Sequence, residues 1–320
     1  VWAAPAGDPP GSPLPPPAGA AHTGPLPLHP MTVGDILDGV FKLFKANAAT
    51  IVAIVAIFSV PTQLVSAWLQ RRTLDGAGLL DAFGDPSVLD GEVSQPLGGT
   101  DLWVTVVVTL VSLLVVPFVA GAVSQVVSAS YLGRRLPAGP ALAATLRRFW
   151  ALLGGWLVCH LPALATGVLA IAVLLAGPGL GTLAIGAAFG LLVAGPALVA
   201  VSALSVAVAP AIVVEGLGPV SGVRRSWSLV RRRFWAVLGI SLLAGLITTL
   251  VAGALGFVPS VAALVLGLEY GWIVLAAGGI LASLVSEPIV AIAATLIYFD
   301  LRIRTEGFDL QIIASELSGP

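Results

Sequence analysis

Long apolar stretches constrain this chain more than any other feature. A helix needs around 20 apolar residues to cross a hydrocarbon core of about 30 Å. Six stretches meet that requirement: residues 48–69, 102–131, 151–176, 182–209, 235–257 and 272–299. Because unpaired backbone groups are costly in lipid, such segments are expected to be helical. The sequence therefore predicts an all-α polytopic membrane protein with about six transmembrane helices, in a membrane domain over residues 31–316.

Composition supports this class and excludes others. Charged residues make up 10% of the 320 residues, whereas a soluble domain carries about 25%. The net charge of −1 provides no field that would recruit nucleic acid. The single cysteine, Cys159, lies in an apolar stretch and offers neither a disulfide framework nor a thiolate metal site. Membrane lipids are therefore the expected partners; a protein partner is a further alternative.

The segments outside the apolar stretches differ in character. Residues 1–30 are rich in proline, glycine and alanine and predict a disordered tail, acting either as a linker or as a proline-rich ligand. No cleavable signal peptide is expected there. The apolar but short segment 258–271 leaves three interpretations open: an interfacial piece, a re-entrant piece or part of a span.

The distribution of charge predicts the orientation in the membrane. In a six-span arrangement nearly all lysines and arginines fall on one side, and the acidic loop of residues 73–100 falls on the other. The excess of basic residues marks the cytoplasmic side. We therefore expect a cell-membrane protein with both termini cytoplasmic and loop 73–100 outside. That loop is either merely solvated or a weak divalent-cation binder, and it has no EF-hand spacing.

Three amphipathic segments precede the odd-numbered spans, beginning near Val33, Pro140 and Pro219. Their apolar side chains recur at helical spacing, which predicts three interfacial helices. Basic residues near an inner membrane surface attract anionic lipid. The expected headgroup contacts are Lys42, Lys45, Arg147, Arg148, Arg224, Arg225, Arg231, Arg232 and Arg233. The alternative is that these residues only set topology.

Two of these segments enter their spans through almost the same sequence. Residues 148–154 read RFWALLG and residues 233–239 read RFWAVLG, whereas residues 44–50 form a weaker third copy. We interpret this as a three-fold internal repeat of one interfacial helix and two spans. The alternative is that basic–aromatic junctions at a membrane surface look alike.

Two ionisable residues interrupt the spans. His160 lies ten residues after Trp150, and Glu287 lies eleven before Tyr298. At 1.5 Å per residue, both are expected near the middle of the membrane, where charge is costly and often functional. One hypothesis is that they meet and carry a proton or line a polar route. The other is that Glu287 bonds a serine such as Ser283 and is structural.

The last span continues into a charged stub. Asp300 with Arg304, and Arg302 with Glu306, stand four residues apart and predict ion pairs on a helix surface. Catalytic signatures are missing: the chain has no P-loop, HExxH motif or nucleophile elbow. We therefore expect a non-enzymatic protein with no catalytic residues, cofactor or metal.

Four stretches together carry a resemblance: residues 27–39, 214–216, 224–227 and 296–310. They resemble the multi-pass membrane domain attached to some glycerophosphodiester phosphodiesterases and common as a stand-alone protein in actinobacteria. The resemblance implies six helices and a membrane role. In the fused members the phosphodiesterase activity belongs to a separate soluble barrel, and no position of this chain matches its catalytic motif.

The leading functional hypothesis is therefore an integral membrane protein that contacts lipid or organises a partner at the inner leaflet. The alternative is a small transporter or permease component, with His160, Glu287 and Gln125 along a polar route. An enzyme acting on membrane lipid is a third alternative.

Overall fold

The computed structural model describes residues 30–74, 99–131, 133–175, 180–266 and 268–307, and within them every regular element is a helix. Almost all of the predicted tail 1–30 and loop 73–100 lies outside the described residues. Among the described residues, four helices are long and apolar enough to cross a membrane: Val33–Trp68, Gly195–Val214, Pro219–Ala263 and Tyr270–Glu306. A fifth is reached if Ala138–Leu146 and Phe149–Pro162, bent by 66°, form one span.

The helices follow the predicted apolar stretches closely. In chain order they are α1 (Val33–Leu74), α3 (Gly99–Tyr131), α4 (Ala138–Leu146), α5 (Phe149–Leu175), α6 (Leu180–Phe189), η2 (Gly190–Ala194), α7 (Gly195–Ser205), α8 (Val208–Glu215), α9 (Pro219–Val230), η3 (Arg231–Arg233), α10 (Phe234–Leu266) and α11 (Leu268–Glu306). The interfacial segments correspond to the first part of α1, to α4 and to α9. Asn47 has non-helical backbone angles and marks the break within α1.

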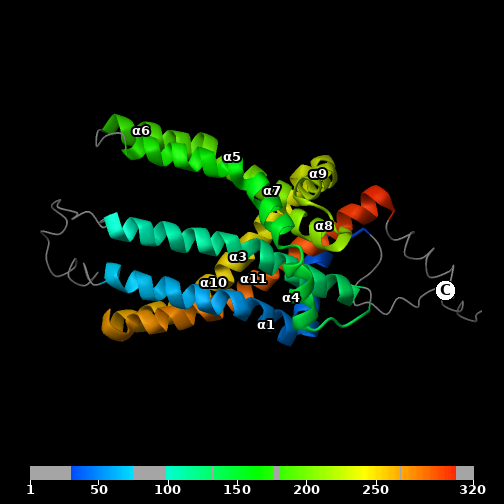
Figure 1. Ribbon diagram of the computed structural model, residues 1–320, viewed down its shortest axis with the longest axis horizontal. Coiled ribbons are helices and arrows are strands. Elements are labelled where there is room, and N and C mark those ends of the chain that lie inside the picture. The colour runs from blue at the N-terminus through cyan, green and yellow to red at the C-terminus, as the bar shows by residue number, and fades with distance from the viewer. Residues whose placement is uncertain (1–29, 75–98, 132, 176–179, 267, 308–320) are drawn as a thin grey trace, which may run out of the picture.

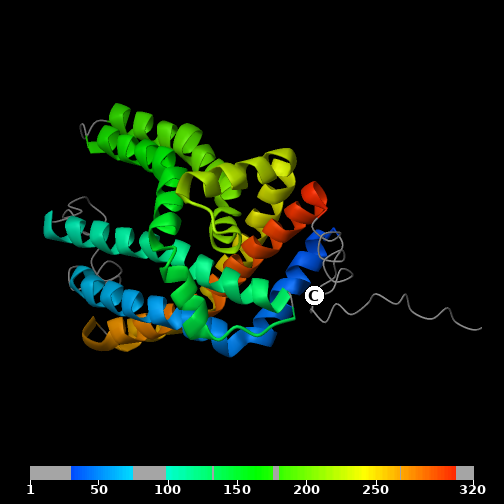
Figure 2. The ribbon, with the colours of Figure 1, turned by 45° about the vertical axis from the view of Figure 1, so that its right-hand side comes forward.

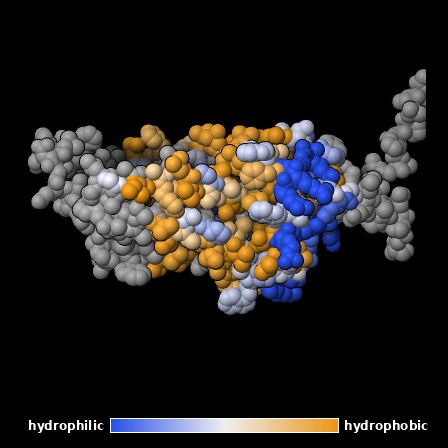
Figure 3. Space-filling view, turned by 90° about the horizontal axis from the view of Figure 1, so that it is seen from above, coloured by the Kyte–Doolittle hydropathy of each residue, from blue (hydrophilic) through white to orange (hydrophobic). Residues whose placement is uncertain are grey.

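The long helices α1, α3, α10 and α11 run lengthwise side by side, while α5 and α6 diverge from them (Figures 1 and 2). The second half of α11 forms the centre of the packing, and residues 291–301 are all buried. The beginning of α1 and the end of α11 lie at the same end of the molecule (Figure 1). Apolar side chains cover the middle of the surface, and strongly hydrophilic ones gather toward that end (Figure 3).

The structure narrows one open interpretation and adds one helix. The segment 258–271 was left open from the sequence, and α10 continues through Pro259 to Leu266, so residues 258–266 extend the helix. Interior proline is tolerated in membrane helices because neighbouring groups satisfy the freed carbonyl. In addition, the chain breaks after α7 and forms the separate helix α8, which the prediction did not include.

Candidate functional site

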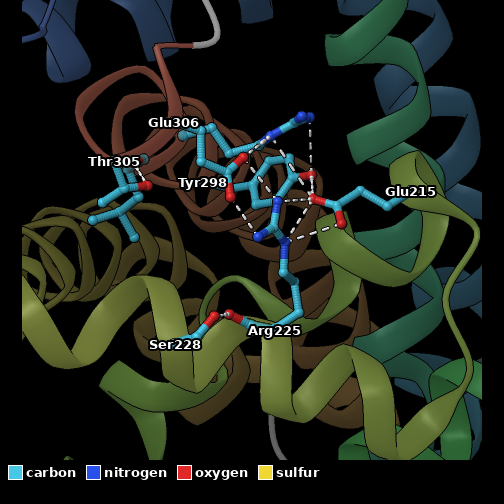
Figure 4. A network of polar contacts seen from close by, with 8 residues as sticks. Glu215, Arg225, Ser228, Tyr298, Thr305 and Glu306 are labelled. Carbon is cyan, nitrogen blue, oxygen red and sulfur yellow. Dashed lines mark hydrogen bonds and ion pairs between the residues drawn. The ribbon is translucent and has the colours of Figure 1, made fainter.

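Five ionisable side chains form a network at the charged end of the molecule (Figure 4). Glu215 is the last residue of α8, and Arg225 lies on α9. The other three, Tyr298, Arg302 and Glu306, stand four residues apart on one face of α11. The network therefore joins three helices that are far apart in the sequence.

Arg225 is the centre of this network. Its Nε donates to both carboxylate oxygens of Glu215 at 3.0 Å, and its Nη2 donates to Glu306 Oε2 at 2.8 Å. The Tyr298 hydroxyl donates to Glu215 Oε1 at 2.5 Å, and Arg302 Nε donates to Glu306 Oε2 at 3.1 Å. Each carboxylate therefore faces two guanidinium groups, since Arg302 Nε also lies 3.8 Å from Glu215.

This pairing shifts the pKa values of Glu306 and Arg225. Burial alone would raise the pKa of Glu306, but hydrogen bonds from Arg225 and Arg302 hold that pKa below its ordinary value. The hydrogen bond to Glu306 in turn raises the pKa of Arg225. Arg225, one of the predicted headgroup contacts, pairs with two carboxylates of the protein, and its side chain is 25% exposed.

Gly216 explains how Glu215 and Arg225 come together. It has a φ of +72°, in the left-handed region where glycine ends helices at low cost. A Cβ at this position would also lie 2.8 Å from Arg148 Nη2, and Arg148 Nη1 donates to the Gly216 carbonyl at 2.6 Å. The chain then re-enters a helix at Pro219, which allows Arg225 to reach back to Glu215.

A second polar cluster ties the beginning of α1 to α11. Asp300 is buried and accepts a hydrogen bond from the Met31 backbone N–H at 2.8 Å. Arg304 Nε donates to both oxygens of Asp300 at 2.8 and 2.9 Å, and its Nη2 donates to the Met31 carbonyl at 2.6 Å. The predicted pairs of the stub, Asp300 with Arg304 and Arg302 with Glu306, are confirmed.

The two clusters bring together all four stretches that carried the family resemblance, as far as the structure describes them. What they can do chemically is limited, because their carboxylates are occupied by arginines. No group of three or more histidine, cysteine or acidic residues that might hold a metal occurs among the described residues. The two clusters at the charged end therefore link α8, α9 and the beginning of α1 to α11.

The structure does not bring His160 and Glu287 together. His160 Nδ1 lies 2.9 Å from the Trp156 carbonyl, and its ring stacks on Trp156 at 4.5 Å. Glu287 instead accepts a hydrogen bond from Ser59 at 2.8 Å. Ser283, the partner considered for Glu287 from the sequence, donates to the Ile280 carbonyl. Gln125 bonds the Val213 carbonyl at 3.3 Å.

Two cavities of about 340 Å³ each lie on either side of α3 and α11. His160 lines the first, together with Ser202, Ser205 and Ser241. The Ser241 Oγ has no hydrogen-bond partner within the part of the chain that the structure describes. Glu287 lines the second cavity, so the two ionisable residues belong to separate spaces.

The second cavity has a polar wall that the sequence reasoning missed. Besides Glu287, it is lined by Ser59, Thr62, Gln63, Ser66, Thr248 and Ser286. The four residues from α1 are spaced i, i+3, i+4 and i+7, which places them on one helix face. That spacing inside an otherwise apolar stretch was the available signal.

The remaining predicted headgroup residues form a basic–aromatic rim at the charged end. Arg147, Arg148, Arg224, Arg231, Arg232 and Arg233 are exposed, as are Lys45 and Lys42, the latter paired with Asp38 at 2.6 Å. Trp150 is 78% exposed and Trp235 is 80% exposed. Each tryptophan meets the preceding phenylalanine edge to face, at 5.0 Å in one copy and 5.3 Å in the other.

The apolar helices and the charged end together define a helical membrane protein. Residues 31–301 match the family described as "Domain of unknown function (DUF7847)", and the chain belongs to this family. No curated protein and no solved structure matches the chain.

Proposed function

We propose that this protein is a non-enzymatic membrane protein whose basic–aromatic rim binds anionic lipid headgroups at the inner leaflet of the cell membrane. The observation that carries the proposal is the pair of like junctions at Arg148–Trp150 and Arg233–Trp235. In each, an exposed arginine precedes a phenylalanine that packs inward and a tryptophan that points outward. Amphipathic rings at headgroup level and basic residues beside them are typical of contact with a lipid surface.

The proposal includes a six-span arrangement with a three-fold repeat and both termini in the cytoplasm. Its support is that the three further predicted stretches 102–131, 151–176 and 182–209 are also largely helical, in α3, in α5 and in the succession of α6, η2 and α7. Each interfacial segment also ends at a local irregularity: Asn47 has non-helical backbone angles within α1, α4 and α5 are bent by 66°, and the short η3 lies between α9 and α10.

A crevice beside the second junction offers room for part of a lipid. Arg233 lines a cavity of about 270 Å³ with Thr32 and with apolar side chains of α1 and α10, and the paired Asp300 and Arg304 form part of the same lining. Arginine binds phosphate through paired N–H donors, and the apolar side chains suit the first carbons of an acyl chain.

The test compares two double variants in nanodiscs of phosphatidylglycerol and phosphatidylcholine, with tightly held lipids identified by native mass spectrometry. Arg232→Gln/Arg233→Gln removes two charges from the junction. The matched control, Arg134→Gln/Arg135→Gln, removes two exposed charges that belong to neither Arg-Phe-Trp junction. At about 1 kcal/mol per arginine, the first variant is expected to retain roughly 30-fold less phosphatidylglycerol. An equal loss in the control would mean that total positive charge, and not the two junctions, retains the lipid. That result would contradict the proposal.

A second candidate function is a small transporter or permease component. The observation that favours it is the polar wall around Glu287, inside helices that are otherwise apolar.

A further inference from the structure

The second cavity differs from an ordinary packing defect in its chemistry. Half of its fourteen lining residues are polar, and they come from α1, α10 and α11. Glu287 is the one acidic or basic residue in this lining. It stands eleven residues before Tyr298, about 16 Å along the helix, and ionisable groups at such a depth are costly and commonly functional.

Three of the five hydroxyl groups that line the cavity have already used their protons. Ser59 donates to Glu287, Thr62 donates to the Phe58 carbonyl at 2.7 Å, and Thr248 donates to the Ala244 carbonyl at 2.6 Å. A hydroxyl has one proton and two acceptor lone pairs. These side chains therefore present acceptors to the cavity, which suits a ligand rich in donors and opposes an anion.

Gln63 adds a side-chain amide to the lining of this cavity. Its amide lies against Gly279, where a Cβ would come within 3.0 Å of Gln63 Oε1. No hydrogen bond from this side chain to another described residue occurs, and the side chain lines the cavity. Val115 and Val119 of α3 and Ala294 of α11 supply an apolar surface to the same cavity.

We propose that this cavity binds a small organic ammonium ion, with its charged nitrogen at Glu287 and its hydrocarbon part against α3. An ammonium group carries three donors and one positive charge, which matches one carboxylate surrounded by acceptor oxygens. The volume of about 340 Å³ exceeds the needs of a bare ion, and a hard divalent cation would require six or more oxygen ligands. This inference goes beyond the proposed lipid contact and does not depend on it.

The experiment measures binding of radiolabelled 2-phenylethylamine, which is protonated at pH 7, to the full chain in nanodiscs. The neutral analogue 2-phenylethanol serves as competitor. Saturable amine binding that the alcohol fails to displace at equal concentration is expected. Equal competition by the alcohol, or no saturable binding above protein-free discs, would overturn the assignment.

Variants locate the site. Glu287→Gln keeps the shape but removes the charge and is expected to weaken amine binding at least tenfold. Thr248→Leu fills the cavity from α10 without touching the carboxyl group and is expected to weaken it similarly, which gives a second readout if the first variant fails to assemble. Ser241→Ala alters the neighbouring cavity and is expected to change affinity less than twofold. Unchanged binding in Thr248→Leu, or in a folded Glu287→Gln, would place the amine elsewhere.

A last arm separates two sources of the ammonium group. Discs containing phosphatidylethanolamine are compared with discs containing only phosphatidylcholine and phosphatidylglycerol. Competition by phosphatidylethanolamine that Glu287→Gln abolishes would identify a lipid headgroup as the source, and its absence would identify a free amine. Competition that persists in Glu287→Gln would overturn the site. Because the rim test reads retained phosphatidylglycerol, failure of one proposal leaves the other intact.

Discussion

Glu215 and Glu287 carry the same side chain, but their carboxylates have very different surroundings. At the charged end, Glu215 meets Arg225, the Tyr298 hydroxyl and, at 3.8 Å, Arg302. In the apolar middle, Glu287 meets a single hydroxyl, that of Ser59, and borders a cavity. A carboxylate paired with guanidinium groups stabilises contacts between helices, whereas one that is left with neutral neighbours keeps its capacity to bind a ligand.

The largest expected effect is the loss of stability on removing Arg225. If Arg225 could be removed without such a loss, the contrast between Glu215 and Glu287 would not hold. Arg225→Met keeps an unbranched apolar side chain but removes the guanidinium group, which leaves Arg302 as the one arginine near the carboxylates of Glu215 and Glu306 among the described residues. Removing one member of a fully buried ion pair costs about 3–5 kcal/mol. Since a quarter of the Arg225 side chain is exposed, we expect a loss of about 2–3 kcal/mol in unfolding by SDS titration.

The neighbouring residue supplies the control for this measurement. Arg224 is exposed on the same helix, so Arg224→Met is expected to change the free energy of unfolding by less than about 0.5 kcal/mol. Equal losses in the two variants would mean that the network contributes nothing beyond general charge.

The helices were predictable from sequence because membrane thickness imposes their length. The predicted stretch 235–257 lies within α10, and 272–299 lies within α11. The extension of α10 through Pro259 was left open, since proline ends helices in water but is tolerated where neighbouring helices satisfy the freed carbonyl. The membrane class follows from this pattern, whereas the number of spans and the resemblance to a phosphodiesterase-associated domain remain predictions.

Side-chain partners were predictable only where they are local. The pairs Asp38–Lys42, Asp300–Arg304 and Arg302–Glu306 follow from i,i+4 spacing and are present. The partners of Arg225 and Glu287 lie on other helices. In helices as uniformly apolar as these, sequence spacing does not determine which faces meet.

The hydrogen bond between Ser59 and Glu287 is expected to contribute less to stability than the Arg225 network. Ser59→Ala removes the hydroxyl that donates to Glu287. Hydrogen bonds between membrane helices contribute about 0.6 kcal/mol on average and up to about 1.7 kcal/mol, so the loss in SDS unfolding is expected in that range. Thr62→Ala removes a hydroxyl that bonds only within α1 and is the matched control. A loss at Ser59 as large as that at Arg225 would erase the contrast between the two regions.

The smallest expected effect is the change in stability at acidic pH that comes from Glu306. The pKa of Glu306 is lower in the folded protein than its ordinary value near 4.3. A carboxyl group with a depressed folded pKa contributes stability that is present above the unfolded pKa and is lost as the pH falls through the folded pKa. Stability is therefore expected to decline below about pH 4, by less than about 1 kcal/mol from this group because it is partly exposed. Glu306→Gln removes this contribution at every pH, so its difference from the wild type in SDS unfolding should be largest at pH 7 and shrink below pH 4. A difference that stays constant from pH 7 to pH 3 would show that Glu306 is held by packing rather than by its arginines.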